Sequence, residues 1–493
     1  MRTMPRALTD PRPLTRVALA TMAALALALP LLGQAPASAG PLGTWTRVSG
    51  ETSEQIGNIA RPSSVRTDDG LLHVVYTRQD SISHQSLQHV VLGDDGEVVA
   101  RSTVVEEWDA LTRDPEILRS GSGLRVVFSG LRDVVATDPF NSGRMYHATS
   151  DASGAVWSLQ PTFLSKSGNA YASNGTGAVD RLDGSAMVAF TPSGSDVLLR
   201  SGEVGDPEAA ADDQRTGVDQ CCVYDAELAR VPGTDEVWAS WVANGRTPTS
   251  LGVFVQRVAP TLGPVLRAPR SVVDYEGTES TSTLSGSAPL LATADGVFVA
   301  YPVGYPTREY LAVWRVGEAA PSRVPNSPNA RYAALSAGPA GRVWVAWVSD
   351  HDVRAARSSA GGGSWGAAVD LGFRTVSGEP SSWGVDIDAT GGTADVVLND
   401  TTALWHQEAL PGLSLAAAPV RIRVDRRTRV GFTVTDAGDR VAGAEVLLAG
   451  ERCTTAADGT CSVRVRPARA RRLVATATLA DHAPGRDTVS VRR

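Results

Sequence analysis

Six short segments of the sequence carry residue types that bind or transform polar ligands. Three of them place two such residues side by side: Arg113-Asp114, Tyr224-Asp225 and Arg331-Tyr332. Three single residues complete the set: Arg61, Asn174 and Trp383. Guanidinium groups, aromatic rings and carboxylates that converge on one opening suit a polyhydroxylated or anionic ligand. The alternative is structural: Arg61 and Asp114 pair with each other, and Trp383 plugs a channel.

Two of these segments also resemble each other in their carboxylates. Asp114-Pro115-Glu116 and Asp225-Ala226-Glu227 occupy matching positions in two repeats of the chain. A pair of carboxylates on either side of a glycosidic bond is the usual machinery of glycoside hydrolysis. The competing interpretation is that a repeated register produces such coincidences without chemistry.

The elements that would position these residues are strands. Seven times between residues 60 and 400, a short apolar strand and a Gly/Asp turn precede a second apolar strand that ends in a large residue. Those residues are Tyr76, Phe128, Phe190, Trp241, Tyr301, Trp347 and Leu398. A strand repeat near fifty residues, with no helical periodicity, predicts an all-β protein built as a β-propeller. We expect seven blades, or six if one degenerate copy is an insertion. The ligand-binding residues then lie where the innermost strands begin.

The N-terminal segment offers a way to close the ring. Residues 43–48 resemble residues 363–369, which read as an outermost strand, yet they have no repeat of their own. The last repeat, 385–408, is one outer strand short. We therefore expect the N-terminal strand to complete the final blade and remove its exposed edge.

The domain prediction divides the chain into four parts. Residues 1–39 read as a secretion signal, 40–413 as the propeller, 414–419 as a linker and 420–493 as a small β-sandwich. The signal has a basic leader, an Ala/Leu run and an A-x-A site, which predicts cleavage after Ala39 and a secreted protein that does not span the membrane. An uncleaved anchor helix is the alternative.

Four cysteines in an exported chain should be oxidised. Cys453 and Cys461 flank a turn and can form a disulfide that joins the two arms of one hairpin. The adjacent Cys221 and Cys222 can form a vicinal disulfide, which would either stiffen a strand or face the central opening of the propeller. Alternatively, both can remain thiols.

The charge of the chain is unevenly distributed. The formal net charge is −7, yet residues 421–493 contain fifteen arginines against eight acidic residues. An acidic body with a basic tail is not the pattern of a nucleic-acid binder. The tail either contacts an anionic polymer of a cell envelope or is a solvated charged surface. No spacing of His or Cys predicts a metal, and no nucleotide motif predicts a cofactor. We expect a monomer.

Two turns carry a family resemblance. Residues 358–365 follow the Asp-box pattern Ser-x-Asp-x-Gly-x-Thr-Trp, with Ala360 in place of the Asp, and residues 150–157 are a second degenerate copy. Residues 40–413 therefore resemble the sialidase-like (BNR/Asp-box) β-propellers. Residues 430–446 and 454–460 resemble the carboxypeptidase regulatory-like, Ig-like β-sandwich modules, which serve as spacers or adhesion units.

The resemblance implies a catalytic set that this chain keeps only in part. Retaining sialidases use an Arg triad, a Tyr nucleophile paired with Glu, and an Asp acid. Tyr332 matches the nucleophile, and Asp80 stands for the acid. Ala60 occupies the place of the first Arg, with Arg61 one step away on what would be the opposite face of a strand. Cys222 replaces the Glu, and of the family's motif around that Glu only Glu227-Leu228 survives.

Three functions remain open at this stage. The favoured one is a carbohydrate-binding propeller, directed at a glycan or glycoconjugate, without ordinary sialidase turnover. The first alternative is an exo-acting glycoside hydrolase that uses Tyr332 in a reorganised site, so whether the chain is an enzyme stays open. The second alternative is an extracellular scaffold for protein partners.

Overall fold

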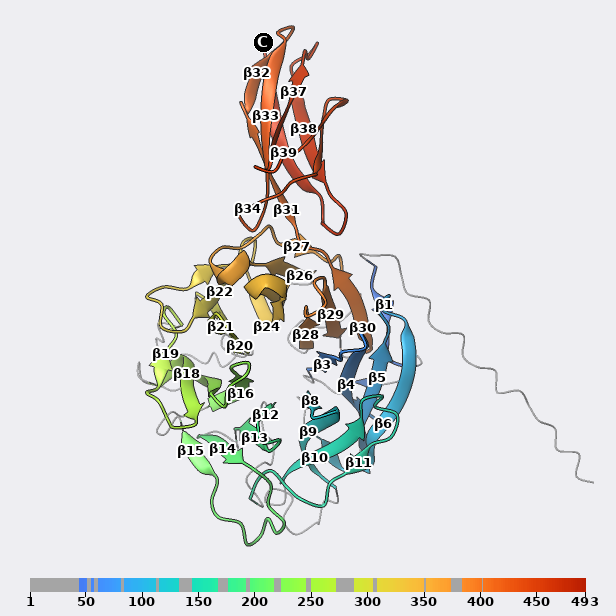
Figure 1. The fold of residues 1–493 in the computed structure, drawn as a ribbon, viewed down its shortest axis with the longest axis vertical. Coiled ribbons are helices and arrows are strands. Elements are labelled where there is room, and N and C mark those ends of the chain that lie inside the picture. Colours follow the sequence, from blue (N-terminus) through green and yellow to red (C-terminus); the bar gives the residue numbers. More distant parts are fainter. Residues whose placement is uncertain are drawn as a thin grey trace, which may run out of the picture. The chain divides into compact units, whose positions relative to one another are not determined.

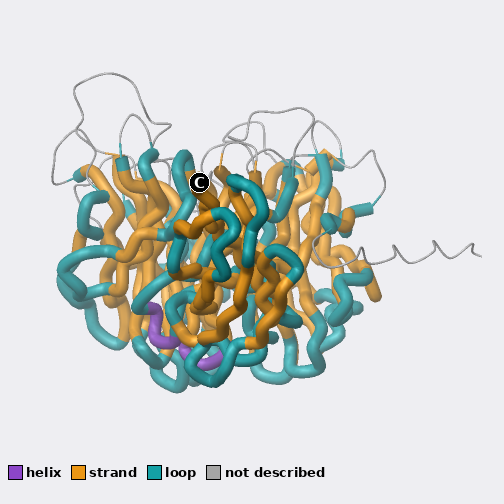
Figure 2. Tube along the Cα trace, turned by 90° about the horizontal axis from the view of Figure 1, so that it is seen from above, coloured by secondary structure: helices purple, strands orange, loops and turns teal. Residues whose placement is uncertain are grey.

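The computed structural model describes a defined part of the 493-residue chain. Its described residues are 44–50, 55–56, 61–80, 84–111, 115–132, 144–166, 176–191, 196–216, 223–244, 250–271, 288–304, 308–349, 352–373, 384–400 and 402–493. Within these ranges the only helical segments are two short 3-10 turns, Pro339–Gly341 and Ala360–Gly362 (Figure 2). The prediction of an all-β protein is confirmed.

The strands between residues 46 and 409 form seven sheets among the described residues, numbered here I to VII. Sheet I contains β2 (Gln55–Ile56), β3 (Ser63–Arg66), β4 (Leu72–Gln79), β5 (Gln85–Leu92) and β6 (Val98–Trp108). Sheet II contains β7 (Ala110–Leu111), β8 (Glu116–Ser120), β9 (Gly123–Leu131), β10 (Arg144–Asp151) and β11 (Ser158–Leu159). Sheet III contains β12 (Thr176–Asp180), β13 (Ala186–Phe190), β14 (Val197–Ser201) and β15 (Gln214–Thr216).

The remaining four sheets of this part repeat the same four-stranded plan. Sheet IV contains β16 (Val223–Arg230), β17 (Val237–Asn244), β18 (Leu251–Ala259) and β19 (Leu266–Arg267). Sheet V contains β20 (Leu290–Thr293), β21 (Gly296–Val303), β22 (Tyr310–Arg315) and β23 (Ser322–Arg323). Sheet VI contains β24 (Ala330–Gly338), β25 (Arg342–Ser349), β26 (Asp352–Arg357) and β27 (Val369–Asp370). Sheet VII contains β28 (Gly384–Asp388), β29 (Ala394–Asn399), β30 (Leu404–Ala409) and β1 (Thr46–Arg47).

The seven sheets form a closed ring. The innermost strands contact one another in the order β3, β8, β12, β16, β20, β24, β28 and back to β3, and they surround the centre in Figure 1. The N-terminal strand β1 pairs with β30 of the last sheet, with Thr46 opposite His406, as the sequence predicts. Each of the seven large residues that marked the repeats lies on a strand of a different sheet.

Apolar packing between neighbouring sheets holds the ring together. One buried cluster joins sheets I and II through Val75 and Phe128, and another joins sheets VI and VII through Trp344 and Val396. Strand β9 is buried along all but its first residue, because both of its faces meet a neighbouring sheet. Such strands read as continuous apolar runs, which is why the repeat is visible in the sequence.

The C-terminal residues form two further sheets. The first contains β31 (Leu413–Ala418), β33 (Thr428–Asp436), β34 (Asp439–Arg440) and β37 (Thr460–Val465). The second contains β32 (Arg421–Arg423), β35 (Glu445–Leu448), β36 (Glu451–Thr454), β38 (Arg472–Thr478) and β39 (Gly485–Arg492). Both sheets contribute to one buried cluster, which includes Phe432 and Val446. We call residues 413–492 the C-terminal sheet pair.

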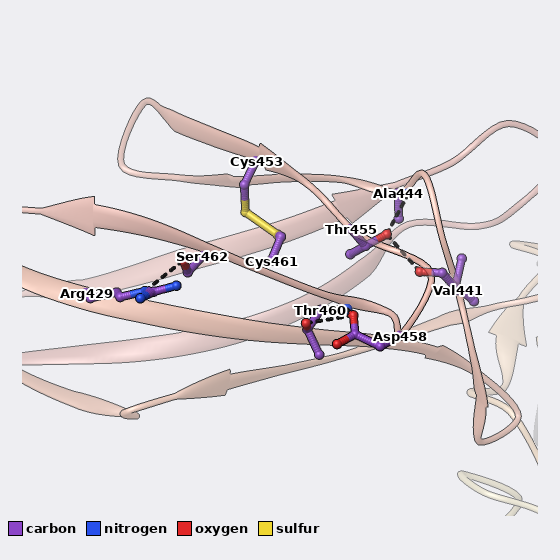
Figure 3. Close-up of a disulfide and its surroundings, with 9 residues drawn as sticks. All are labelled: Arg429, Val441, Ala444, Cys453, Thr455, Asp458, Thr460, Cys461 and Ser462. Atoms are coloured by element: carbon purple, nitrogen blue, oxygen red, sulfur yellow. Dashed lines mark hydrogen bonds between the residues drawn. A yellow bond between two sulfur atoms is a disulfide. The ribbon is translucent and has the colours of Figure 1, made fainter.

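Two details of the C-terminal sheet pair differ from the sequence-based expectation. Most of the predicted linker, 414–419, lies instead in β31, which pairs with β33. The small residues of this segment gave no sign of a strand in the sequence, yet Leu413 and Ala417, which share one face of β31, are buried. The predicted disulfide between Cys453 and Cys461 is present (Figure 3), but it joins β36 to β37, which belong to different sheets, and not the two arms of one hairpin ladder.

The described residues contain no helix that is long and apolar enough to cross a membrane.

Candidate functional site

Several residues predicted for the site lie outside the described residues. They are Arg113, Asp114, Asn174, Trp383, Cys221 and Cys222, together with the leader 1–39. The predicted site residues that the structure describes are Arg61, Tyr224, Asp225, Glu227, Arg331, Tyr332 and Asp80.

An ion pair crosses the middle of the ring. Arg61, just before β3 of sheet I, donates from Nη2 to the Oε1 atom of Glu227 on β16 of sheet IV. Sheets II and III separate these two sheets on one side of the ring, and sheets V, VI and VII separate them on the other. Both side chains are largely shielded, with exposed fractions of 16% and 12%. The pair therefore marks the point where residues from opposite sides of the ring meet.

This contact brings Arg61 toward the middle of the ring, whereas its offset of one residue from the family's first Arg suggested the opposite face of a strand. The expectation assumed that residue 61 lies in a regular strand, where a step of one residue reverses the side chain. Strand β3 begins only at Ser63, so the alternation does not apply to Arg61. The described partner of Arg61 is Glu227, whereas Asp114, the partner considered from the sequence, lies outside the described residues.

A second group of charged and polar residues gathers around Tyr332 on β24. The side chain of Tyr332 is buried, and its phenol interacts electrostatically with Arg331, Arg308 and Asp225. Arg308 comes from the segment between β21 and β22 of sheet V, and Asp225 comes from β16 of sheet IV. Three sheets thus contribute to one local environment. The carboxylate that acts on Tyr332 is that of Asp225, whereas Glu227, the residue suggested by the sequence, is held by Arg61.

Backbone irregularities in two inner strands aim these side chains. Strand β16 shifts register between Tyr224 and Glu227, and strand β24 shifts between Arg331 and Ala334. Inside each irregularity one non-glycine residue has a positive φ, 53° at Asp225 and 47° at Tyr332. Such a conformation is uncommon for non-glycine residues and persists where the surroundings enforce it. Bulges next to functional sites commonly redirect a side chain out of the regular alternation.

Burial sets the protonation of this group. It raises the pKa of Tyr332, and Asp225 raises it further, while Arg331 and Arg308 act in the opposite direction. Burial, together with the nearby Arg331, also lowers the pKa of Arg308 to about 10. At neutral pH the phenol is therefore protonated and can donate a hydrogen bond, and the guanidinium of Arg308 remains charged. Tyr332 could act as a nucleophile only if another group, for which Asp225 is a candidate, accepted its proton.

Asp386 is a site residue that the sequence did not reveal. It lies on β28, and its Oδ2 atom accepts a hydrogen bond of 2.6 Å from the Oγ atom of Ser64 on β3. Burial raises the pKa of Asp386 to about 6, although the Ser64 hydrogen bond and the positive charge of Arg61 oppose this shift. A carboxyl with such a pKa can donate or accept a proton near neutrality. The only signal in the sequence was an acidic residue placed between the apolar Val385 and Ile387.

We define the central charged cluster as these two groups of interacting residues, which β16 connects because it carries both Asp225 and Glu227. They are Arg61, Asp225, Glu227, Arg308, Arg331, Tyr332 and Asp386. The cluster combines three guanidinium groups, three carboxyls and one phenol from five of the seven sheets or their connecting segments. A pocket of about 320 Å³ between sheets V and VI involves other residues, namely Asn326, Pro328, Arg354, Ala368 and Asp370.

Asp80 and Tyr224 have different places in this arrangement. Asp80 follows the end of β4, is exposed, and pairs with Arg78 at 2.5 Å. None of the interactions found among the described residues joins Asp80 to Tyr332. Tyr224 precedes Asp225 on β16 and is half-buried beside the cluster.

The two Asp-box-like turns hold sheet edges. In the first, the Oγ atom of Ser150 donates to the carbonyl of Val156, and Trp157 donates to Ser102 on β6 of the preceding sheet. In the second, Ser358 and Trp365 form a β-bridge, and Trp365 donates to Ser322 on β23. Both tryptophans therefore anchor one sheet to its neighbour and take no part in the central charged cluster.

Comparison with known proteins gives structural likeness only. No family model matches the sequence, and no curated protein matches it. Among solved structures, a Hadza microbial sialidase is 13% identical, with 72% of this chain and 66% of that chain covered and a TM-score of 0.44. An α-L-arabinofuranosidase from Fusarium graminearum is 13% identical over 63% and 94% of the two chains, with a TM-score of 0.40. A polysaccharide lyase is 8% identical over 73% and 91%, with a TM-score of 0.43. These likenesses are too distant to carry an activity or a substrate to this chain.

Proposed function

We propose that the chain is a secreted, seven-bladed β-propeller followed by a small β-sandwich, and that it binds a glycan or glycoconjugate at the propeller centre. Each of the seven sheets is one blade, strand β1 closes the last blade, and the leader is removed after Ala39. The protein acts as a monomer outside the cell.

The observation that carries this proposal is the ion pair between Arg61 and Glu227 across the ring. It shows that the innermost strands bring side chains of opposite sheets into contact at one place. Beside this pair, Tyr332, Arg331 and Arg308 offer hydrogen-bond donors, and the carboxyls offer acceptors. Closely spaced donors and acceptors of this kind suit the hydroxyl groups of a sugar. A carboxylate on the sugar would exchange with Glu227 for the guanidinium of Arg61.

The experiment is a glycan array probed with the mature chain, with acidic and neutral glycans printed side by side. Wild-type protein should bind a subset of these glycans, and Arg331→Ala should weaken that binding by about tenfold or more, because a charge-assisted hydrogen bond is lost. Arg215→Ala is the matched control, since Arg215 is an exposed arginine on β15 at the outer edge of sheet III. An array without any binder would instead favour the protein scaffold.

Hydrolysis is the second candidate, and the environment of Tyr332 favours it specifically. A buried phenol beside Asp225, together with a protonatable Asp386 on the neighbouring inner strand β28, provides a nucleophile, a proton acceptor and an acid. Two observations argue against ordinary sialidase activity. The charge of Arg61 is already neutralised by Glu227, and the phenol of Tyr332 keeps its proton. Incubation with fluorogenic glycosides, sialosides included, separates the candidates. Turnover that disappears in Tyr332→Phe would establish the hydrolase, and no turnover with intact binding would support the binding protein.

A further inference from the structure

The arginines of the C-terminal sheet pair gather at one end of it. Strand pairing brings together residues 421–429, 464–472 and 490–493, which contain twelve arginines and one acidic residue, Asp425. The rest of residues 413–493 contains three arginines and seven acidic residues. We call the end with the twelve arginines the arginine pole. If the arginines reflected only the overall composition of the chain, they would be spread over the sheet pair and not gathered at one end.

Backbone contacts fix the arginine pole as one surface. Arg429 on β33 lies opposite Arg464 on β37, and Arg423 on β32 lies beside Arg492 on β39. The loop between β32 and β33 meets the loop between β37 and β38, because the Asp425 amide donates to the Pro467 carbonyl at 2.9 Å. Segments some seventy residues apart in the chain therefore present their guanidinium groups at the same end.

The arginines of this pole are exposed and have no ion-pair partner among the residues that the structure describes. All twelve belong to exposed residues, and the described part of the chain contains no ion pair that includes any of them. The contacts found for their side chains are to neutral groups, such as the bond of 2.9 Å from Arg429 to Ser462. Like charges directly opposite each other on paired strands destabilise a sheet, as at Arg429 and Arg464. The fold therefore keeps a local repulsion that a bound anion would relieve.

The dimensions and composition of the pole indicate the type of anion. Ser490 on β39 pairs with Arg421 on one side and with Arg472 on the other, so the positive charge extends over three neighbouring strands. Neighbouring strands are about 4.8 Å apart, so this row is longer than one anionic group and suits a polymer. Arginine binds tetrahedral phosphate in a bidentate manner. The only aromatic side chain of the sheet pair other than a histidine is the buried Phe432, so no ring is available to stack on bases.

We propose that the arginine pole binds a linear polymer that carries phosphate groups on a non-aromatic backbone. The partner is recognised through rows of charge, and its affinity depends steeply on salt because counterions are released on binding. The site is separate from the central charged cluster and does not depend on the proposed function.

The test measures binding of labelled linear polyphosphate to the full mature chain by fluorescence anisotropy over a range of salt concentrations. The variant replaces four pole arginines in loops with serine: Arg426, Arg427, Arg469 and Arg471. The control variant replaces four exposed arginines elsewhere with serine: Arg132, Arg215, Arg440 and Arg486. Both variants remove the same charge, so a difference between them reports position.

Wild-type protein should bind the polyphosphate, and the pole variant should bind it about tenfold or more weakly. The slope of log affinity against log salt concentration should be shallower for the pole variant than for the wild type, by up to about four. The control variant should keep most of the affinity. Failure of the wild type to bind, or equal losses in both variants, would overturn the proposal. Tighter binding of poly-glutamate would overturn the phosphate chemistry, and tighter binding of oligo-deoxythymidine would overturn the non-aromatic backbone. Arg426→Ser/Arg427→Ser, with about half the expected change in slope, serves as a second variant should the first not fold.

Discussion

Replacing Asp386 by asparagine should stabilise the protein, and the gain should grow as the pH rises. Burial raises the pKa of Asp386 to about 6, compared with about 3.9 for a solvated aspartate. A carboxyl whose pKa is raised on folding favours the folded state while it is protonated, and this contribution is lost as the pH rises through the folded-state pKa. A shift of about two units corresponds to at most about 3 kcal/mol, reduced to the extent that water screens this half-buried side chain.

The assay is denaturant unfolding of the wild type and Asp386→Asn, followed by tryptophan fluorescence at about pH 4, 6 and 8, which runs from near the solvated pKa to well above the folded-state pKa. The difference in unfolding free energy should be small at the lowest pH, should increase between about pH 4 and 6, and should then level off. The amide of asparagine can still accept the hydrogen bond from Ser64, so this contact is preserved.

A control lies two residues away on the same strand. Asp388 accepts hydrogen bonds at 3.0 Å from the backbone amides of Arg66 and Thr390. Asp388→Asn should therefore destabilise the protein, by about 1 kcal/mol, because bonds to a charged acceptor are weakened. If Asp386→Asn destabilised the protein at every pH, or gave the same gain at about pH 4 and 8, the reasoning about Asp386 would be refuted. A gain in stability with weaker ligand binding would identify a residue kept for function.

Three further predictions concern buried polar groups and the disulfide. His89 is buried, and burial together with the charge of His73 lowers its pKa to about 3. The unfolding free energy should therefore be highest above about pH 6.5 and should fall by about 1.4 kcal/mol per pH unit below that value. His89→Gln should flatten this pH dependence in denaturant unfolding, whereas His482→Gln should not. Cys453 and Cys461 close a loop with a sequence separation of 8. Reducing this disulfide, or replacing both cysteines by serine, should lower the free energy of unfolding by about 2–3 kcal/mol, which would be measured as a lower thermal midpoint of the C-terminal sheet pair. Thr455→Val should cost about 1–3 kcal/mol in the same assay, because its hydroxyl donates to one backbone group and accepts from another (Figure 3); an unchanged midpoint would contradict this.

The sequence predicted the fold well where strands are buried on both faces. Continuous apolar runs that end in Phe128 or Trp347 are hard to mistake, and their spacing gives the repeat. The closing strand was also predictable, because residues 43–48 had no partner within their own repeat. The strand at 413–418 was missed because alanine-rich segments resemble linkers, and the burial of Ala417 becomes evident only with its partner strand.

The candidate site was predictable by residue but not by contact. Arg61, Glu227 and Tyr332 were selected from the sequence, yet the pairing of Arg61 with Glu227 joins residues 166 positions apart and leaves no local signal. The environment of Tyr332 depends on two strand irregularities, which change the facing of side chains without a recognisable motif. Asp386 required knowledge of which inner strands are neighbours, since Ser64 lies 322 residues away.

The central claim is that opposite sheets of the ring bring Arg61 and Glu227 into direct contact, and a double-mutant cycle tests it most directly. The unfolding free energies of wild type, Arg61→Met, Glu227→Gln and the double variant yield the coupling energy between the two side chains. We expect a favourable coupling of about 1–3 kcal/mol, as found for residues that share an ion pair. A coupling indistinguishable from zero would contradict the contact and remove the basis for a binding site at the centre of the ring.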